Sequence, residues 1–315
     1  MNADSSNNTR LCTALLLCGL GLLTACSVQP EIQPQEARVS ERMLGRFANP
    51  EITESSGLAA SRKQAGVFWT MNDSGGQAKL YAFDLAGRDL GSWPIASASN
   101  IDWEAMTQGA CPQAQQGDCI FIGDTGDNPE QREYVTIYIV SEPEIQAGDS
   151  APVQRLTAER IDFRHDQGAQ DVEGMFLMPN GHLGLVSKGR QGSVHLHTLN
   201  LGAAASSPTT SRRVLTLFES VTQQTGEWVT GAALSPDGRA LAVLSYANLF
   251  VFATDPATGL PLIEIAPTRC ALQPLDLLQG EAVAWLPVDS EWTHLLTSEG
   301  AAGQIAGISC PSPVQ

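Results

Sequence analysis

The sequence predicts an all-β fold, and within that class a β-propeller, from three observations. Helical periodicity is nearly absent beyond an apolar run close to the N-terminus, and short β-rich runs alternate with Gly, Asn, Asp and Pro. A motif that opens a strand with a small residue behind a polar or acidic one recurs five times. The same order of strand, turn and strand follows each copy, which favours a ring of similar sheets. A β-sandwich or an irregular barrel is the alternative.

The spacing of the motifs is that of propeller blades. They are Glu54-Ser55-Ser56-Gly57, Asp102-Trp103-Glu104-Ala105, Asp171-Val172-Glu173-Gly174, Val229-Thr230-Gly231 and Gln279-Gly280-Glu281-Ala282. Alignment on Ser56, Glu104, Glu173, Thr230 and Glu281 gives intervals of 48, 69, 57 and 51 residues. Blades of about four strands have periods of roughly 40–50 residues. We therefore expect five blades, with residues 155–163 as an outer strand, although the longest interval could hold a sixth.

The two ends of the chain are expected to close the ring. The fifth unit stops soon after Ile308, before an outer strand of its own, and residues 43–47 form an isolated strand candidate. Adding that N-terminal strand to the last blade would remove an exposed sheet edge.

Residues 1–25 are typical of a lipoprotein signal peptide. Arg10 precedes an apolar run over residues 11–23, and Leu23-Thr24-Ala25-Cys26 resembles a bacterial lipobox. The alternative, a transmembrane anchor, is disfavoured because the run is too short to cross a bilayer core of about 30 Å. Cys26 would then carry the lipid (palmitate) and bind the protein to the outer membrane on its periplasmic side. Residues 26–41 are expected to be a flexible tether, and residues 42–315 the propeller domain.

The charge of the chain restricts its partners. Its 34 acidic residues exceed its 18 Lys and Arg, for a net charge of −16. A nucleic acid backbone would be repelled, so we expect no nucleic acid partner. A monomer that binds a small molecule or an envelope protein is the expectation.

Four cysteines remain outside the first 26 residues, and an even number in an exported chain favours disulfide bonds. We expect Cys111 to pair with Cys119 and Cys270 with Cys310. A zinc site is the alternative, but the spacings match no zinc pattern.

Carboxylates in the opening strands indicate a cation site. Because side chains alternate along a strand, Asp102 and Glu104 share a face with Met106, and Asp171 and Glu173 share one with Met175. In a propeller the opening strands line the central channel, so Glu104, Glu173 and Glu281 should converge there. Carboxylates that lie so close together must take up protons or bind a cation, and oxygen-only ligands favour Ca²⁺.

The turns after the second strands should add a rim to this site. Its expected residues are Asp73, Asp124 with Asp127 and Asn128, Lys188, Tyr246 and Glu299. Asp and Asn also simply cap β-turns, which is the alternative for Asp73 and Asn128. Lys188 could replace a metal by pairing with the glutamates. His195 and His197 alternate on a strand without further ligands, so exposed strand histidines are the expectation.

Four motifs in this order are similar to a known family. Glu54-Ser55-Ser56-Gly57-Leu58, Asn72-Asp73-Ser74-Gly75, Asp102-Trp103-Glu104-Ala105 and Gly123-Asp124-Thr125-Gly126-Asp127-Asn128 resemble secreted bacterial β-propellers of the SdiA-regulated or esterase-like phytase type. The resemblance extends over residues 50–190, and Thr230 departs from its acidic pattern. It implies a propeller fold and an association with calcium, and it implies no particular reaction.

Two classes of function follow. The first is a ligand-binding or scaffold module of the cell envelope. The second is a metal-assisted hydrolase of a phosphoester or lactone, in which Glu104 or Glu173 activates water. No serine elbow, phosphate-binding loop or His-Glu-x-x-His motif occurs in the sequence, so the binding module is the favoured expectation.

Overall fold

The computed structural model describes residues 11–12, 26–27, 33–112, 117–145, 155–203, 208–219, 227–272 and 279–313. The chain separates into two compact units, Met1–Gln33 and Pro34–Gln315. In the first unit the described residues form two paired strands, β1 (Leu11–Cys12) and β2 (Cys26–Ser27). Most of the predicted signal peptide and residues 28–32 of the predicted tether lie outside the described residues.

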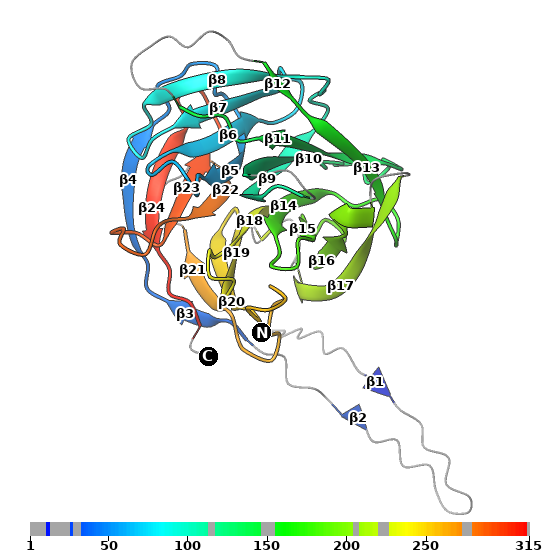
Figure 1. Ribbon diagram of the computed structural model, residues 1–315. Coiled ribbons are helices and arrows are strands. Elements are labelled where there is room, and N and C mark those ends of the chain that lie inside the picture. The colour runs from blue at the N-terminus through cyan, green and yellow to red at the C-terminus, as the bar shows by residue number, and fades with distance from the viewer. Residues whose placement is uncertain are drawn as a thin grey trace, which may run out of the picture. The chain divides into compact units, whose positions relative to one another are not determined.

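The second unit contains four sheets, of eight, five, five and four strands, and their antiparallel pairings form five groups of four strands (Figure 1). The eight-stranded sheet holds two of these groups, because Glu159–His165 and Thr209–Glu219 pair in parallel. Group 1 contains β5 (Ser55–Ala60), β6 (Phe68–Asn72), β7 (Lys79–Phe83) and β8 (Asp89–Ala96). Group 2 contains β9 (Trp103–Ala110), β10 (Asp118–Asp124), β11 (Val135–Ser141) and β13 (Glu159–His165). Group 3 contains β14 (Val172–Leu177), β15 (Leu183–Ser187), β16 (Ser193–Leu199) and β17 (Thr209–Glu219). Group 4 contains β18 (Val229–Leu234), β19 (Ala240–Ser245), β20 (Asn248–Ala253) and β21 (Thr268–Ala271). Group 5 contains β22 (Gly280–Trp285), β23 (His294–Ser298), β24 (Gln304–Ser309) and, from the N-terminal side, β4 (Ser40–Arg46).

The groups surround a common centre, as a β-propeller requires. The first strand of each group, β5, β9, β14, β18 and β22, contacts the first strand of the next group, and β22 contacts β5. Each of the five predicted motifs opens one of these inner strands. The predicted outer strand at residues 155–163 falls mainly in β13; the short β12 (Leu156–Thr157) beside it crosses to pair with β8. The only helical element among the described residues is the short η1 (Leu201–Ala203).

The ring is closed by the N-terminal strand, as the sequence predicts. β4 pairs antiparallel with β24 and supplies the outer edge of group 5. A second N-terminal strand, β3 (Gln35–Ala37), pairs in parallel with β21 of group 4. The predicted tether boundary at residue 41 is therefore too late, because residues 35–37 and 40–41 lie in sheets. An outer strand is held by backbone hydrogen bonds, so its polar side chains do not prevent pairing.

The hydrophobic core consists of five clusters, and each lies between two neighbouring groups. The largest side chains between groups 1 and 2 are Trp69 and Trp103, and those between groups 2 and 3 include Phe121 and Phe163. Three further clusters join groups 3 and 4, 4 and 5, and 5 and 1. Among the described residues, no helix is both long enough and apolar enough to cross a membrane.

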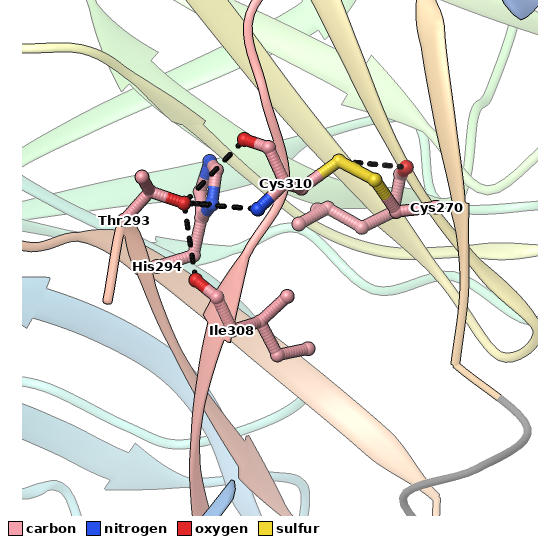
Figure 2. The surroundings of a disulfide bond; sticks show 6 residues. Cys270, Thr293, His294, Ile308 and Cys310 are labelled. Atoms are coloured by element: carbon pink, nitrogen blue, oxygen red, sulfur yellow. Dashed lines mark hydrogen bonds between the residues drawn. A yellow bond between two sulfur atoms is a disulfide. The ribbon is translucent and has the colours of Figure 1, made fainter. Parts of the chain in front are cut away.

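Both predicted disulfide bonds are present. Cys111 and Cys119 close a short loop in group 2, and Cys270 of β21 bonds to Cys310, which follows β24. Figure 2 shows the second bond, where the hydroxyl of Thr293 accepts the N–H of Cys310 at 3.1 Å and donates to the carbonyl oxygen of Ile308 at 3.0 Å. This disulfide joins the two groups on which β3 and β4 also lie.

The two disulfides should differ in their contribution to stability. They span 40 residues for Cys270–Cys310 and 8 residues for Cys111–Cys119. Loop-closure entropy then predicts losses of about 4 and about 2.5 kcal/mol on removal. Urea unfolding of the double variants Cys270→Ala/Cys310→Ala and Cys111→Ala/Cys119→Ala measures the difference. Equal losses would contradict this account.

Candidate cation site

Each inner strand begins with a β-bulge. Where the inner strand pairs with the second strand of its group, the register skips one residue near the start of the inner strand. The skipped residue has no partner on the second strand. The omitted residues are Ser56, Glu104, Glu173, Thr230 and Glu281. All five are buried. A bulge re-aims a side chain and is frequent beside functional sites. We call these five residues the bulge ring; they are the residues on which the sequence motifs align.

A second set of equivalent positions lies in the turn after each second strand. In each turn one backbone N–H donates to the carbonyl oxygen of the residue two positions before the bulge. The donors are Asp73, Gly126, Lys188, Tyr246 and Glu299, with N–O distances of 2.8–3.3 Å. We call these residues the turn ring. Four were predicted, but in group 2 the equivalent position is Gly126 and not Asp124, which is the last residue of β10.

Gly126 leaves space for two carboxylates of the site. A Cβ atom at this position would lie 2.6 Å from Cγ of Asp102 and 2.7 Å from Cγ of Glu104. Such contacts are shorter than van der Waals packing permits. The turn ring therefore has a gap at group 2, which the carboxylate of Asp102 and the γ-methylene of Glu104 occupy.

One buried ammonium group lies among the glutamates of the bulge ring. Nζ of Lys188 is 2.5 Å from Oε1 of Glu173, and both side chains are buried. The hydroxyl of Ser56 donates to Oε2 of Glu104 at 2.6 Å. The amide of Gln279 donates to Oε1 of Glu281 at 3.2 Å. The glutamates thus share one charged neighbourhood with Lys188 at its centre.

Burial shifts the pKa values of these groups. It raises the pKa of Glu281 to about 9, assisted by the charge of Glu173, and it raises the pKa of Glu104 well above its ordinary value. Burial alone would lower the pKa of Lys188, but Glu173 and its neighbours raise it, so the amine stays protonated. Burial also raises the pKa of Glu173, against the effect of Lys188. Because Nζ is in hydrogen-bond contact with it, Glu173 is the carboxyl that carries the charge facing Lys188.

Arginine guanidinium groups neutralise two other carboxylates that were predicted to bind a metal, and a backbone N–H donates to a third. Oδ1 of Asp124 is 2.8 Å from Nη2 of Arg132, and Oδ2 of Asp171 is 2.6 Å from Nε of Arg190. Asp127 accepts the backbone N–H of Arg132 at 2.7 Å. The structure thus places these aspartates in ion pairs and hydrogen bonds within the chain, in place of the predicted open metal ligands.

The predicted rim residue Asn128 also belongs to this network, since its amide oxygen accepts a hydrogen bond from Arg190. The guanidinium of Arg190 in turn lies over the ring of Trp228. Arg132 and Arg190 are not among the predicted site residues, although each is close in sequence to a predicted rim residue.

Several carboxylates of the predicted site, Glu281 and Glu299 among them, have no Lys or Arg in ion-pair contact among the described residues, and three others without such a contact lie close together. Asp73, Asp102 and Glu104 each offer an oxygen atom, and these oxygens lie within 4.8 Å of one another. Burial, followed by the charge of Asp73, raises the pKa of Asp102 to about 6. Two oxygens bound to one Ca²⁺ at 2.3–2.6 Å are at most about 5 Å apart. The spacing therefore fits a single ion, and we call this trio the cation cluster.

An unpaired oxygen atom lies beside the cluster. Oδ1 of the fully buried Asp124 accepts the backbone N–H of Asp102 at 3.3 Å, whereas Oδ2 has no hydrogen-bond partner among the described residues. A buried carboxylate oxygen without a partner is costly.

The channel is closed directly below the bulge ring. Glu104 and Glu173 line a cavity of about 10 Å³ together with the apolar side chains of Leu58, Met106 and Met175. Such a volume admits about one water molecule. A separate cavity of about 440 Å³ lies at the other ends of the inner strands, lined by Trp285 and Leu177 among others. A ligand of the cation cluster must therefore approach from the rim.

The histidines of β16 differ from the expectation of exposed side chains. His197 is buried, because β17 covers this strand, and its ring lies 5.0 Å from that of His165. His195 contacts Arg213 at 2.8 Å. Among the described residues, no histidine takes part in a group with metal-ligand spacing.

Comparison with known proteins gives a distant likeness of fold. No family model and no curated sequence matches the chain. The PQQ-bound aldose sugar dehydrogenase of Streptomyces coelicolor is similar at 11% identity and a TM-score of 0.48, covering 87% of this chain and 98% of its own. A putative gluconolactonase is similar at 12% identity and a TM-score of 0.42, covering 90% and 97%. A streptogramin B lyase is similar at 9% identity and a TM-score of 0.42, covering 87% and 98%. At these values the likeness carries no argument about ligand or reaction.

Replacing Glu281 should change the pH dependence of stability. Its pKa is about 9 in the fold and 4.5 in the ordinary state, so the unfolded chain releases the proton first as the pH rises. Its contribution is complete below pH 4.5 and declines up to pH 9, by at most about 1.4 kcal/mol per pH unit. Glu281→Gln, which resembles the protonated acid, should therefore flatten the fall in stability between pH 5 and 9.

Urea unfolding with a chelator at pH 5, 7 and 9 measures this effect. Exposed Glu264→Gln is the matched control and should retain the wild-type profile. A Glu281→Gln profile identical to that of the wild type would show that Glu281 holds no proton in the fold.

Proposed function

We propose that the protein is a cation-dependent binding module of the bacterial cell envelope, with a calcium ion held by Asp73, Asp102 and Glu104. The supporting observation is the cation cluster itself: three carboxylate oxygens lie within 4.8 Å of one another, and Gly126 leaves room for the side chains of Asp102 and Glu104. Calcium takes six to eight oxygen ligands, so three carboxylates leave positions for water and for a ligand oxygen.

The donor atoms favour calcium over transition metals. The cluster contains only carboxylates, whereas zinc and copper sites in proteins generally include imidazole or thiolate. The cysteines beyond the lipobox are engaged in disulfides. The resemblance of the four motifs to secreted propellers of the SdiA-regulated or esterase-like phytase type agrees with this choice.

The ligand would bind at the rim, through the open positions of the ion. Its class is a small molecule with an anionic or polar oxygen, or an envelope protein that presents such a group. The protein would act as a monomer, bound through the lipid on Cys26 to the outer membrane and facing the periplasm.

A metal-assisted hydrolase is the second candidate, and the position of Glu104 favours it. This carboxyl belongs to the cation cluster, and its pKa is well above the ordinary value because of burial and the nearby charge of Glu173. In its deprotonated form such a carboxylate is more basic than usual, so it could accept a proton from water while a bound ion would polarise a phosphoester or lactone oxygen.

Calcium should raise the melting temperature of the wild-type domain relative to chelator. A ligand that binds only the folded state at 100 times its Kd adds about 2.7 kcal/mol, which is several degrees for a domain of this size. Asp102→Asn should abolish most of the shift, since it removes one of three charged ligands. The exposed Asp289→Asn removes the same charge elsewhere and should keep the shift.

The same variants decide between the two candidates. Turnover of generic phosphoesters or lactones by the wild type, lost in Glu104→Gln even at CaCl₂ concentrations high enough to restore its calcium shift, would establish the hydrolase. An inactive wild type with a normal calcium shift supports the binding module. Absence of any shift in the wild type would contradict the cation site.

Cys26→Ser should release the protein from the membrane. Without the thiol no lipid can be attached, so the variant should move from the membrane fraction to the soluble fraction of a cell lysate. Cys111→Ala/Cys119→Ala is the control and should stay in the membrane fraction. Membrane retention of Cys26→Ser would contradict lipidation at this residue.

A further inference from the structure

The amine of Lys188 lies where a metal ion bound by Glu173 of the bulge ring would lie. It comes from the turn ring of group 3, and its amine contacts Glu173 of the bulge ring at 2.5 Å. Glu104 and Asp171 are also close enough to raise the pKa of Lys188, and Lys188 in turn lowers the pKa of Glu281. A single positive charge therefore faces carboxylates from groups 2, 3 and 5.

The compensation divides the acidic end of the channel into two halves. In one half Lys188 faces Glu173 and Arg190 faces Asp171, so the charges are supplied by the chain. In the other half Asp73, Asp102 and Glu104 have no Lys or Arg within ion-pair distance among the described residues. The cation cluster is confined to this second half.

We propose that Lys188 is the resident cation of the bulge ring: it supplies the charge that Glu173 would otherwise take from a metal ion, and it thereby limits divalent-cation binding to the cation cluster. The statement that the wild type binds one divalent cation, at the cation cluster, rests on the proposed function. The statement that Lys188 replaces a metal ion beside Glu173 does not. Lys188 is a positioning residue, because it acts through the charge of its neighbours.

Removal of the amine should create a new cation site. In Lys188→Gln the carboxylate of Glu173 loses its partner while it remains buried beside Glu104 and Glu281. Buried carboxylates without a counter-charge must bind protons or a cation. The variant should therefore bind one more equivalent of Ca²⁺ than the wild type, as measured by isothermal titration calorimetry at pH 8 with CaCl₂.

Two controls separate the effect from a general change of charge. Lys79 also forms an ion pair with a glutamate, Glu51, at 2.7 Å, but on the surface of group 1. Lys79→Gln should leave the stoichiometry unchanged. Lys188→Arg keeps the positive charge and should also bind as many ions as the wild type.

A double variant keeps the proposal testable if Lys188→Gln folds poorly. Lys188→Gln/Glu173→Gln removes one positive and one negative charge together, so it should melt at a higher temperature than Lys188→Gln alone in chelator. It should also bind no ion beyond the wild-type number. A double variant as unstable as the single variant would overturn the role of Lys188 as the counter-charge of Glu173.

The outcomes also distinguish the two proposals. One ion in the wild type and two in Lys188→Gln support both. No ion in the wild type and one in Lys188→Gln support the substitution of a metal by Lys188 and refute the calcium site of the proposed function. Equal stoichiometry in the wild type and Lys188→Gln overturns the inference about Lys188.

Discussion

Charge compensation at the acidic end of the channel is the constraint on which the rest of the structure depends. A propeller brings the inner strands of all groups to one axis, and in this chain three of the five bulge residues are glutamates. Carboxylates in a buried, partly apolar channel cannot remain charged without partners. Lys188, Arg132 and Arg190 supply positive charge to Glu173, Asp124 and Asp171, whereas the cation cluster, Glu281 and Glu299 have no basic partner in ion-pair contact among the described residues.

The positions of the bulge ring and the turn ring are set by the backbone. The bulge at the start of each inner strand breaks the ladder at one residue and directs that side chain toward the channel, and the hydrogen bond from each turn fixes the turn ring above it. The groups are equivalent in backbone, so their chemistry differs only through side chains. Gly126 is the clearest case, because the missing side chain at one of five equivalent positions leaves space that Asp102 and Glu104 of the cation cluster fill.

The sequence predicts the repeated elements well because each is local. Alignment on Ser56, Glu104, Glu173, Thr230 and Glu281 marks the inner strands, and the missing outer strand after Ile308 predicts that β4 closes the ring. The counter-charges were harder to assign. Arg132 neutralises Asp124, but nothing in the spacing says that a loop residue will fold back on the strand end. The sequence also did not show that Gly126 and Lys188 occupy equivalent positions in their turns. The turn of group 2 is longer than that of group 3, and the alignment was made on its aspartates. His197 was misjudged because burial of β16 depends on β17, which lies farther along the chain.

The attachment of the N-terminal segment has a mechanical consequence. A pull on the residues that precede Gln35 acts first on β3, which is held to β21 by only three residue pairs, and then on the seven-residue β4. The two strands lie on groups 4 and 5, which the Cys270–Cys310 disulfide links covalently. Under such a load β3 would separate from β21 first, and the Cys270–Cys310 disulfide would keep groups 4 and 5 together. The ring of carboxylates would then keep its shape, because the inner strands are the last to experience the force.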